Sequence, residues 1–93
     1  MIEFVKFNVN EILTKIVGVN IEEIKVFENN DRLCINLDLK RANENSKEIH
    51  FTDYVRIIVD DFVQHNTNYE LCYESACNVD NIVMEYRLKK GDD

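Results

Sequence analysis

Carboxylates are the side chains of this sequence whose number and spacing point most clearly to chemistry. From Glu48 to Tyr86 there are eight acidic residues and one base, Arg56. Carboxylates spaced along a helix and a sheet can pair with the lysines and arginines that hold nucleic-acid phosphates in other proteins. The pattern therefore predicts a binding surface for a basic protein. Its candidate residues are Asp53, Asp60, Asp61, Glu70, Glu74 and Glu85.

The same carboxylates do not form the pairs that acid–base catalysis needs. Asp60 and Asp61 are adjacent, so on a helix they point about 100° apart and cannot share a proton. The only glycines are Gly18 and Gly91, which excludes a glycine-rich phosphate loop. We therefore expect no catalytic residues and no enzymatic activity, and a minimal enzyme ranks behind two kinds of binding protein.

Cysteine and histidine add no catalytic or metal site by their spacing. A reactive thiolate needs a neighbouring base or cation, whereas Cys72 and Cys77 lie in the most acidic stretch and Cys34 has no histidine placed to serve it. His65 follows Asp61 by one helical turn, which supplies two ligands where a metal site needs three or four. We expect inert thiols, no metal and no cofactor.

Composition indicates one domain with an acidic surface. The chain has 93 residues, a net charge of −7 and a pI near 4.7, with a net of −1 over residues 1–47 and −6 over residues 48–93. Nucleic acids and anionic membranes require cationic contacts, so both are disfavoured as direct partners. An odd number of cysteines and the lack of an apolar leader predict a cytoplasmic protein. Residues 1–93 form the domain, and residues 89–93 are expected to be a frayed tail.

The first helix is predicted from a stripe of apolar residues. It should begin at a capping Asn8, with Glu11 three residues later, and end at Gly18. The stripe comprises Val9, Ile12, Leu13, Ile16 and Val17. Residues 1–7 fit either a short strand or a backward extension of this helix.

A β-hairpin follows, with two possible registers. Leu33, Ile35, Leu37 and Leu39 alternate with polar residues, as on a strand with one buried face. A turn at Asn29-Asn30 pairs Val26 with Leu33, so that one face is wholly apolar. A turn at Asn30-Asp31 instead places Glu28 opposite Leu33. We prefer the first register.

The rest of the chain predicts one more helix and three more strands. Ile49 to Phe51 suggests a short third strand, and Thr52 should cap a helix that ends at Asn66. This helix is expected to bury Tyr54, Val55, Ile58, Val59 and Phe62 and to expose Asp60 and Asp61. Two alternating runs, one around Tyr69–Tyr73 and one at Ile82–Leu88, complete the set, with Tyr69, Leu71 and Tyr73 on one face.

The predicted fold is α+β, a two-layer sandwich of a mostly antiparallel five-stranded sheet with two helices on one face, in the order α-β-β-β-α-β-β. The function we expect is that of a small acidic inhibitor or neutraliser of a basic, nucleic-acid-directed protein such as a nuclease. Immunity proteins, antitoxins and phage anti-defence or anti-CRISPR proteins are the classes of this size and charge. The alternative is a homo-oligomeric accessory or structural protein, such as a homodimer formed through an exposed strand edge.

Overall fold

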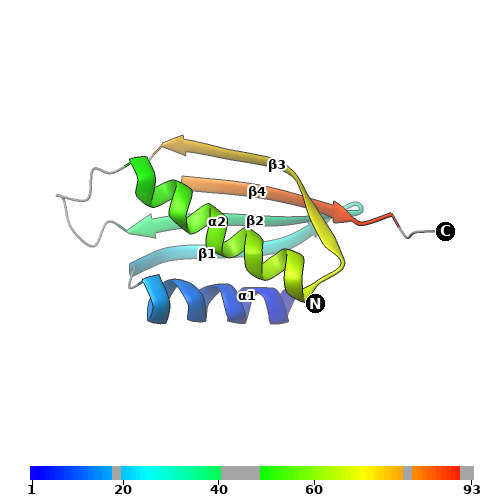
Figure 1. The fold of residues 1–93 in the computed structure, drawn as a ribbon, viewed down its shortest axis with the longest axis horizontal. Coiled ribbons are helices and arrows are strands. Elements are labelled where there is room, and N and C mark those ends of the chain that lie inside the picture. Colours follow the sequence, from blue (N-terminus) through cyan, green and yellow to red (C-terminus); the bar gives the residue numbers. More distant parts are fainter. Residues whose placement is uncertain (18–19, 41–48, 79–80, 91–93) are drawn as a thin grey trace.

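A computed structural model describes residues 1–17, 20–40, 49–78 and 81–90 (Figure 1). A helix, α1 (Ile2–Glu11), continues into a π-helical segment, η1 (Ile12–Val17). Two strands follow, β1 (Asn20–Asn29) and β2 (Arg32–Lys40). A long helix, α2 (Ile49–Asn66), leads to β3 (Tyr69–Asn78) and β4 (Asn81–Leu88).

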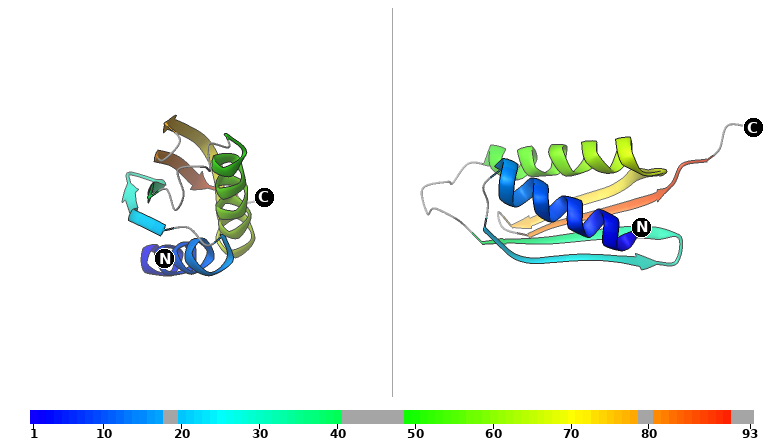
Figure 2. Two further views of the ribbon diagram at one scale, coloured as in Figure 1. Left: turned by 90° about the vertical axis from the view of Figure 1, so that its left-hand side faces the viewer. Right: turned by 90° about the horizontal axis from the view of Figure 1, so that it is seen from below.

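The described strands form a four-stranded antiparallel sheet in the order β1-β2-β4-β3. The chain is thus a helix and a hairpin followed by a second helix and hairpin, and the second strands of the two hairpins pair in the middle of the sheet. The predicted α+β class and the antiparallel sheet are correct, but five strands were expected and four are present. The two-layer sandwich is not confirmed, because α1 runs along β1 at the margin of the sheet while α2 crosses its face (Figure 2).

One hydrophobic core joins both helices to the sheet. Val5, Val9 and Leu13 of the first helical stretch meet Val55, Val59 and Val63 of α2. The sheet contributes the side chains that alternate toward the helices, namely Val26, Leu33, Ile35, Leu37, Leu39, Tyr69, Ile82, Met84 and Tyr86. The opposite face of the sheet carries no described helix (Figure 2). The two sides of the sheet therefore differ in what they offer to a partner.

The first helix begins earlier than expected. Residues 2–7 belong to α1, which resolves the ambiguity of the N-terminal segment in favour of helix. Asn8 is consequently not a cap, and its side-chain amide donates to the Phe4 carbonyl one turn back. Val5 continues the stripe of Val9 and Leu13, and burying this third position favours the longer helix. The expected end at Gly18 lies outside the described residues.

The preferred hairpin register is wrong. Val26 pairs with Ile35, and Glu28 pairs with Leu33, so the turn comprises Asn30 and Asp31. Asn30 adopts a positive φ of 58°, a conformation that asparagine tolerates well. Glu28 remains exposed at the end of β1 although its neighbour Leu33 is buried, so the pairing that we rejected leaves no carboxylate in the core. The shift is two residues, which keeps every side chain on its expected face.

The expected third strand does not exist, because Ile49 already begins α2. Two apolar residues spaced by two are too short a signal to outweigh the helical period that follows. Thr52 is not a cap but a buried residue within the helix, and it starts the stripe that Val55, Val59 and Val63 continue.

The buried face of α2 is rotated from the predicted one. Val55 and Val59 are buried as expected, but Tyr54 is half exposed and Ile58 and Phe62 lie at the border of the core. Asp60, expected to be exposed, is partly buried. Polar side chains can line this border because their charged ends still reach water or partners.

An extra residue in β3 reverses the faces of its second half. Leu71 pairs with Tyr86 and Tyr73 with Glu85, which leaves Cys72 as a bulge. Tyr73 therefore points away from the helices and is exposed, contrary to prediction. Glu74 pairs with Met84 and lies on the helix side of the sheet.

Candidate protein-binding site

Three of the six predicted carboxylates meet in a groove between α2 and β3. Asp53 and Asp60 come from the helix, and Glu74 reaches the groove because the bulge in β3 reverses its face. The cavity has a volume of about 350 Å3. The described residues that line it are Asp53, Arg56, Ile57, Asp60, Leu71 and Glu74.

Arg56 lies at the centre of this groove and ties the helix to the strand. Its guanidinium forms an ion pair with Asp53 one turn away and has Nη1 3.8 Å from a carboxylate oxygen of Glu74. The buried Nε has no hydrogen-bond partner among the described residues. One guanidinium thus neutralises part of the charge of two carboxylates, and the groove keeps a negative excess.

Asp60 is held in place by two hydrogen bonds. The Tyr86 hydroxyl donates to Oδ1 over 3.0 Å, and the Gln64 amide donates to Oδ2 over 2.9 Å. Burial of the Tyr86 ring, and then the charge of Asp60 and the bond to it, raise the pKa of the phenol. The phenol therefore stays a donor, which orients the carboxylate at the border of the core.

The acidic surface continues along α2 past Ile57. A second depression, of about 210 Å3, is lined by Ile57, Asp60, Asp61, Gln64 and His65. Asp61 is exposed, and His65 Nδ1 lies 3.2 Å from its Oδ1, as the spacing of one turn predicts. The two depressions share Ile57 and Asp60, so they form one surface. We call this surface, made of Asp53, Ile57, Asp60, Asp61 and Glu74, the α2 acidic surface.

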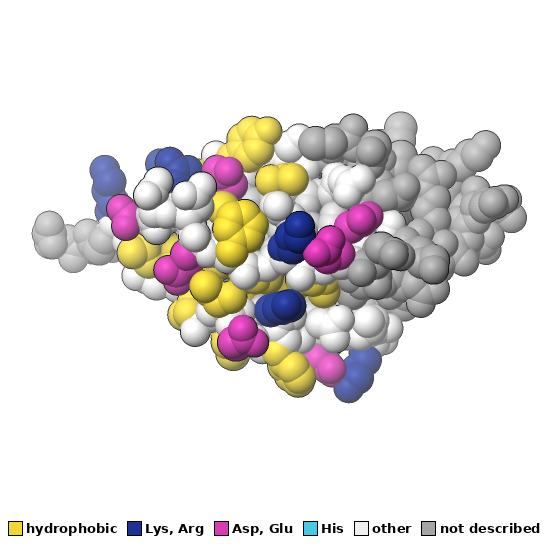
Figure 3. Space-filling model, turned by 180° about the vertical axis from the view of Figure 1, so that it is seen from behind, with side chains coloured by type: hydrophobic (Ala, Val, Ile, Leu, Met, Phe, Trp, Pro, Cys, Tyr) yellow, Lys and Arg dark blue, Asp and Glu magenta, His cyan; other side chains and the backbone are white. Residues whose placement is uncertain are grey.

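The other two predicted carboxylates lie elsewhere. Glu70 accepts a hydrogen bond of 3.0 Å from Nε of Arg87, its neighbour across the β3–β4 pair. Glu85 lies 4.0 Å from Nη1 of Arg32 on the face of the sheet opposite the helices. On that face, side chains of both charges alternate with hydrophobic ones (Figure 3). The predicted set is therefore divided between two faces.

Sequence reasoning missed Ile57. It is 67% exposed, although isoleucine is usually buried, and it lies at the middle of the carboxylates. The signal was present in the sequence: an isoleucine outside the apolar stripe of a helix, on the side of Asp53 and Asp60. A large exposed aliphatic side chain among charges is typical of an interface anchor.

The thiols show no arrangement for catalysis. Cys34 is buried, and burial first, then the charge of Glu85, raise the pKa of its thiol. The Cys72 sulfur accepts from Arg32 and donates to the Glu85 carbonyl over 3.3 Å. Both cysteines are free. Among the described residues no group of three histidine, cysteine, aspartate or glutamate side chains is arranged to hold a metal ion.

Comparison with known proteins adds no relative. No protein-family model, curated protein or solved structure matches this chain. None of the described helices combines the length and hydrophobicity needed to cross a bilayer.

Proposed function

We propose that this protein is a small acidic inhibitor that binds a basic, nucleic-acid-directed protein, such as a nuclease, through the α2 acidic surface. The observation that carries the proposal is the position of Ile57, exposed between two depressions that are lined by carboxylates. An apolar anchor ringed by charges matches the composition of protein interfaces, in which a few buried residues supply most of the affinity.

The charge of this surface selects the class of partner. Asp53, Asp60, Asp61 and Glu74 contribute four carboxylates. Among the described residues, Arg56 is the one arginine or lysine that lines the two depressions. Lysines and arginines of a nucleic-acid-binding protein are spaced to contact phosphates, and carboxylates can accept hydrogen bonds from the same side chains. Such complementarity speeds association and suppresses wrong partners.

The experiment reverses two charges of the surface, the half-buried Asp53 and the exposed Asp61. Asp53→Lys/Asp61→Lys changes the net charge from −7 to −3, since each reversal adds two units. Proteins captured from host lysate by the parent chain and by the variant are identified by mass spectrometry. The captured protein is then purified, and its association rate is measured at several salt concentrations. We expect a basic partner that the variant binds more slowly and with a weaker dependence on salt.

A matched control separates the surface from net charge alone. Glu28→Lys/Asp31→Lys adds the same four units of charge at the exposed β1–β2 turn, far along the chain from α2. This control should bind much as the parent does. If both variants weaken partner binding equally, only net charge matters. If neither weakens it, the binding surface lies elsewhere on the protein.

Homo-oligomerisation is a second candidate, favoured by one observation. The sheet face opposite the helices carries Phe27 and Tyr73, which are exposed, beside arginines and glutamates that a second copy could pair with. Sedimentation velocity over a wide concentration range tests this candidate. A dimer that Tyr73→Lys dissociates supports it, and a monomer at all concentrations excludes it.

A further inference from the structure

Large apolar side chains are exposed where the two helices meet. Phe4 and Phe7 of α1 and Tyr54 of α2 are all exposed, Phe7 to 63%. The rings of Phe4 and Phe62 pack with their centroids 5.7 Å apart, so the Phe4 side of α1 faces α2. Ile58 and Tyr54 precede Phe62 by one and two turns and lie on the same side of α2. We call the surface made of Phe4, Phe7, Tyr54, Ile58 and Phe62 the helix apolar surface.

Packing of the core does not account for this surface. Ile58 and Phe62 reach only the border of the core, and neither Phe7 nor Tyr54 belongs to it. At exposed helix positions, phenylalanine and tyrosine also stabilise the helix less than lysine or glutamate would. Contiguous apolar side chains on the outside of a folded domain are typical of a contact site. The helix apolar surface therefore has the composition of an interface.

Charges at its border favour a basic occupant over a second copy. Ile57 and Asp61 follow Tyr54 and Ile58 by three residues, so the helix apolar surface is continuous with the α2 acidic surface. Asp61 forms no ion pair with a lysine or arginine among the described residues. Residues 2–17 add no net charge on the other side. A second copy placed here would bring like charges together, whereas a basic segment is attracted.

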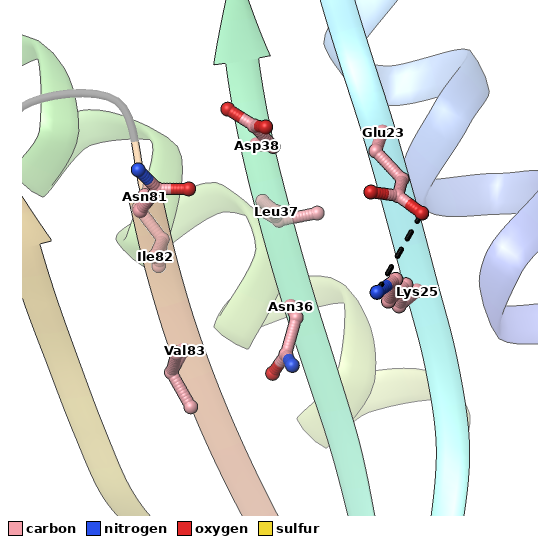
Figure 4. A pocket seen from close by; sticks show the side chains of 8 residues that line it. All are labelled: Glu23, Lys25, Asn36, Leu37, Asp38, Asn81, Ile82 and Val83. Carbon is pink, nitrogen blue, oxygen red and sulfur yellow. Dashed lines mark ion pairs between the residues drawn. The ribbon is translucent and has the colours of Figure 1, made fainter.

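The open face of the sheet lacks this combination. Its cavity, of about 190 Å3, is lined by charges of both signs, and Lys25 lies 3.7 Å from Glu23 (Figure 4). The arginines of β2 and β4 on this face likewise lie beside glutamates. The exposed rings of Phe27 and Tyr73 thus stand among compensated charges, and they supply a matched control for the helix apolar surface.

The spacing of the apolar side chains fits a helix rather than an extended segment. Tyr54, Ile58 and Phe62 span two turns of α2, about 12 Å along its axis at about 1.5 Å per residue. Helices bond their backbone groups internally, so α1 and α2 offer no edge to which a strand could add. A third helix packed along them can place apolar residues, repeated every three or four positions, between these side chains.

We propose that the helix apolar surface binds an amphipathic helix of the partner protein. The apolar stripe of that helix covers Phe4, Tyr54 and Ile58, and its lysines and arginines lie over Asp61. This inference rests on the proposed function for the class of partner, and it adds the kind of segment by which that partner binds.

The test uses a synthetic peptide in place of the partner. The peptide has blocked ends and about 18 residues, or five turns, with leucine on one helical face and lysine elsewhere. It is titrated into the 15N-labelled protein at constant ionic strength, and backbone amide shifts are followed. We expect saturable shifts in α1 and in α2 from Tyr54 onward. A peptide of the same composition in scrambled order, and one with glutamate in place of lysine, should each bind at least about tenfold more weakly.

Paired variants locate the contact. Phe7→Ser/Tyr54→Ser removes two exposed rings from the helix apolar surface and should weaken the leucine–lysine peptide by about tenfold or more. Phe27→Ser/Tyr73→Ser removes the same two types of ring from the open sheet face and should leave peptide binding unchanged. Should the first double variant unfold, Tyr54→Ser alone replaces it, with an expected weakening of at least about threefold.

Four results overturn the inference. They are the absence of saturable shifts on the two helices up to roughly 1 mM peptide, equal affinity for either control peptide, equal weakening by both double variants, and a dimer that Phe7→Ser/Tyr54→Ser dissociates. The inference also falls, while the proposed function stands, if the captured partner binds Asp53→Lys/Asp61→Lys more slowly but Phe7→Ser/Tyr54→Ser as well as the parent chain. Peptide binding as expected without capture of a basic protein supports the inference and removes the proposed function.

Discussion

Truncating Val59 tests the orientation of α2, on which the placement of the whole acidic surface depends. Val59 is fully buried in the core that joins both helices to the sheet, on the stripe of Val55, Val59 and Val63, of which the first two were predicted to be buried. Val59→Ala removes two methyl groups, which corresponds to about 1.6 kcal/mol of lost transfer free energy at about 0.8 kcal/mol each. The cavity left in a packed core adds to this loss, so we expect a total of about 2–3 kcal/mol.

Ile57→Ala is the matched comparison on the same helix. Its side chain is 67% exposed, so most of the removed surface already contacts water. The expected change in the free energy of unfolding lies within about 0.5 kcal/mol. Urea unfolding followed by circular dichroism measures both variants. With a slope of about 1–1.5 kcal/mol per molar urea for a domain of this size, Val59→Ala should lower the midpoint by roughly 2 M.

The comparison has a clear failing result. If Ile57→Ala destabilises the monomer as much as Val59→Ala does, α2 is rotated from the orientation described and the α2 acidic surface is not the exposed face. Ile58→Ala should fall between the two, because Ile58 is partly buried.

The remaining predictions concern one tyrosine and two cysteines of the sheet. Tyr86→Phe should destabilise the fold by about 0.5–1.5 kcal/mol through loss of the bond to Asp60. Because the folded state raises the pKa of Tyr86, its contribution to stability is complete below the ordinary pKa of 10.0 and declines as pH rises above that value. In an alkaline titration followed by phenolate absorbance, the Tyr86 phenol should ionise only as the chain unfolds, and ionisation of all four tyrosines in the folded protein would contradict this. Cys34→Ser should lower the free energy of unfolding, measured in urea, by about 1–3 kcal/mol, because it places a hydroxyl in a buried site. Cys72→Ser should retain partner binding. Loss of binding in folded Cys72→Ser would assign that thiol a function.

The regular parts of the fold could be predicted from the sequence because their pattern repeats. The alternation from Leu33 to Leu39 predicted the buried face of β2, and all four of its apolar side chains are buried. Val9 and Leu13 are likewise buried in the first helical stretch. Hydrophobic period reports which side of an element faces the core, and it does so even when the pairing partner is misassigned by two residues, as in the β1–β2 hairpin.

The site was less predictable because it depends on irregular features. Nothing in the order Leu71, Cys72, Tyr73 marks Cys72 as a bulge, yet that extra residue moves Glu74 to the helix side and places it beside Arg56. The predicted buried face of α2 was wrong for a related reason. Tyr54 and Phe62 are large enough to seem core residues, but the narrow valine stripe packs on the sheet and leaves the rings at its border.

All three register breaks in the sheet lie on its outer strands. The extra residues are Glu22 in β1 and Cys72 and Cys77 in β3, whereas the central β2–β4 pair is regular. The outer strands of an open sheet present unpaired backbone groups that invite another chain to add itself, which is how many proteins aggregate. A bulge interrupts the even row of donors and acceptors that such an addition needs. Each bulge thus shortens the regular edge that β1 or β3 offers to an added strand, which disfavours indefinite edge-to-edge growth.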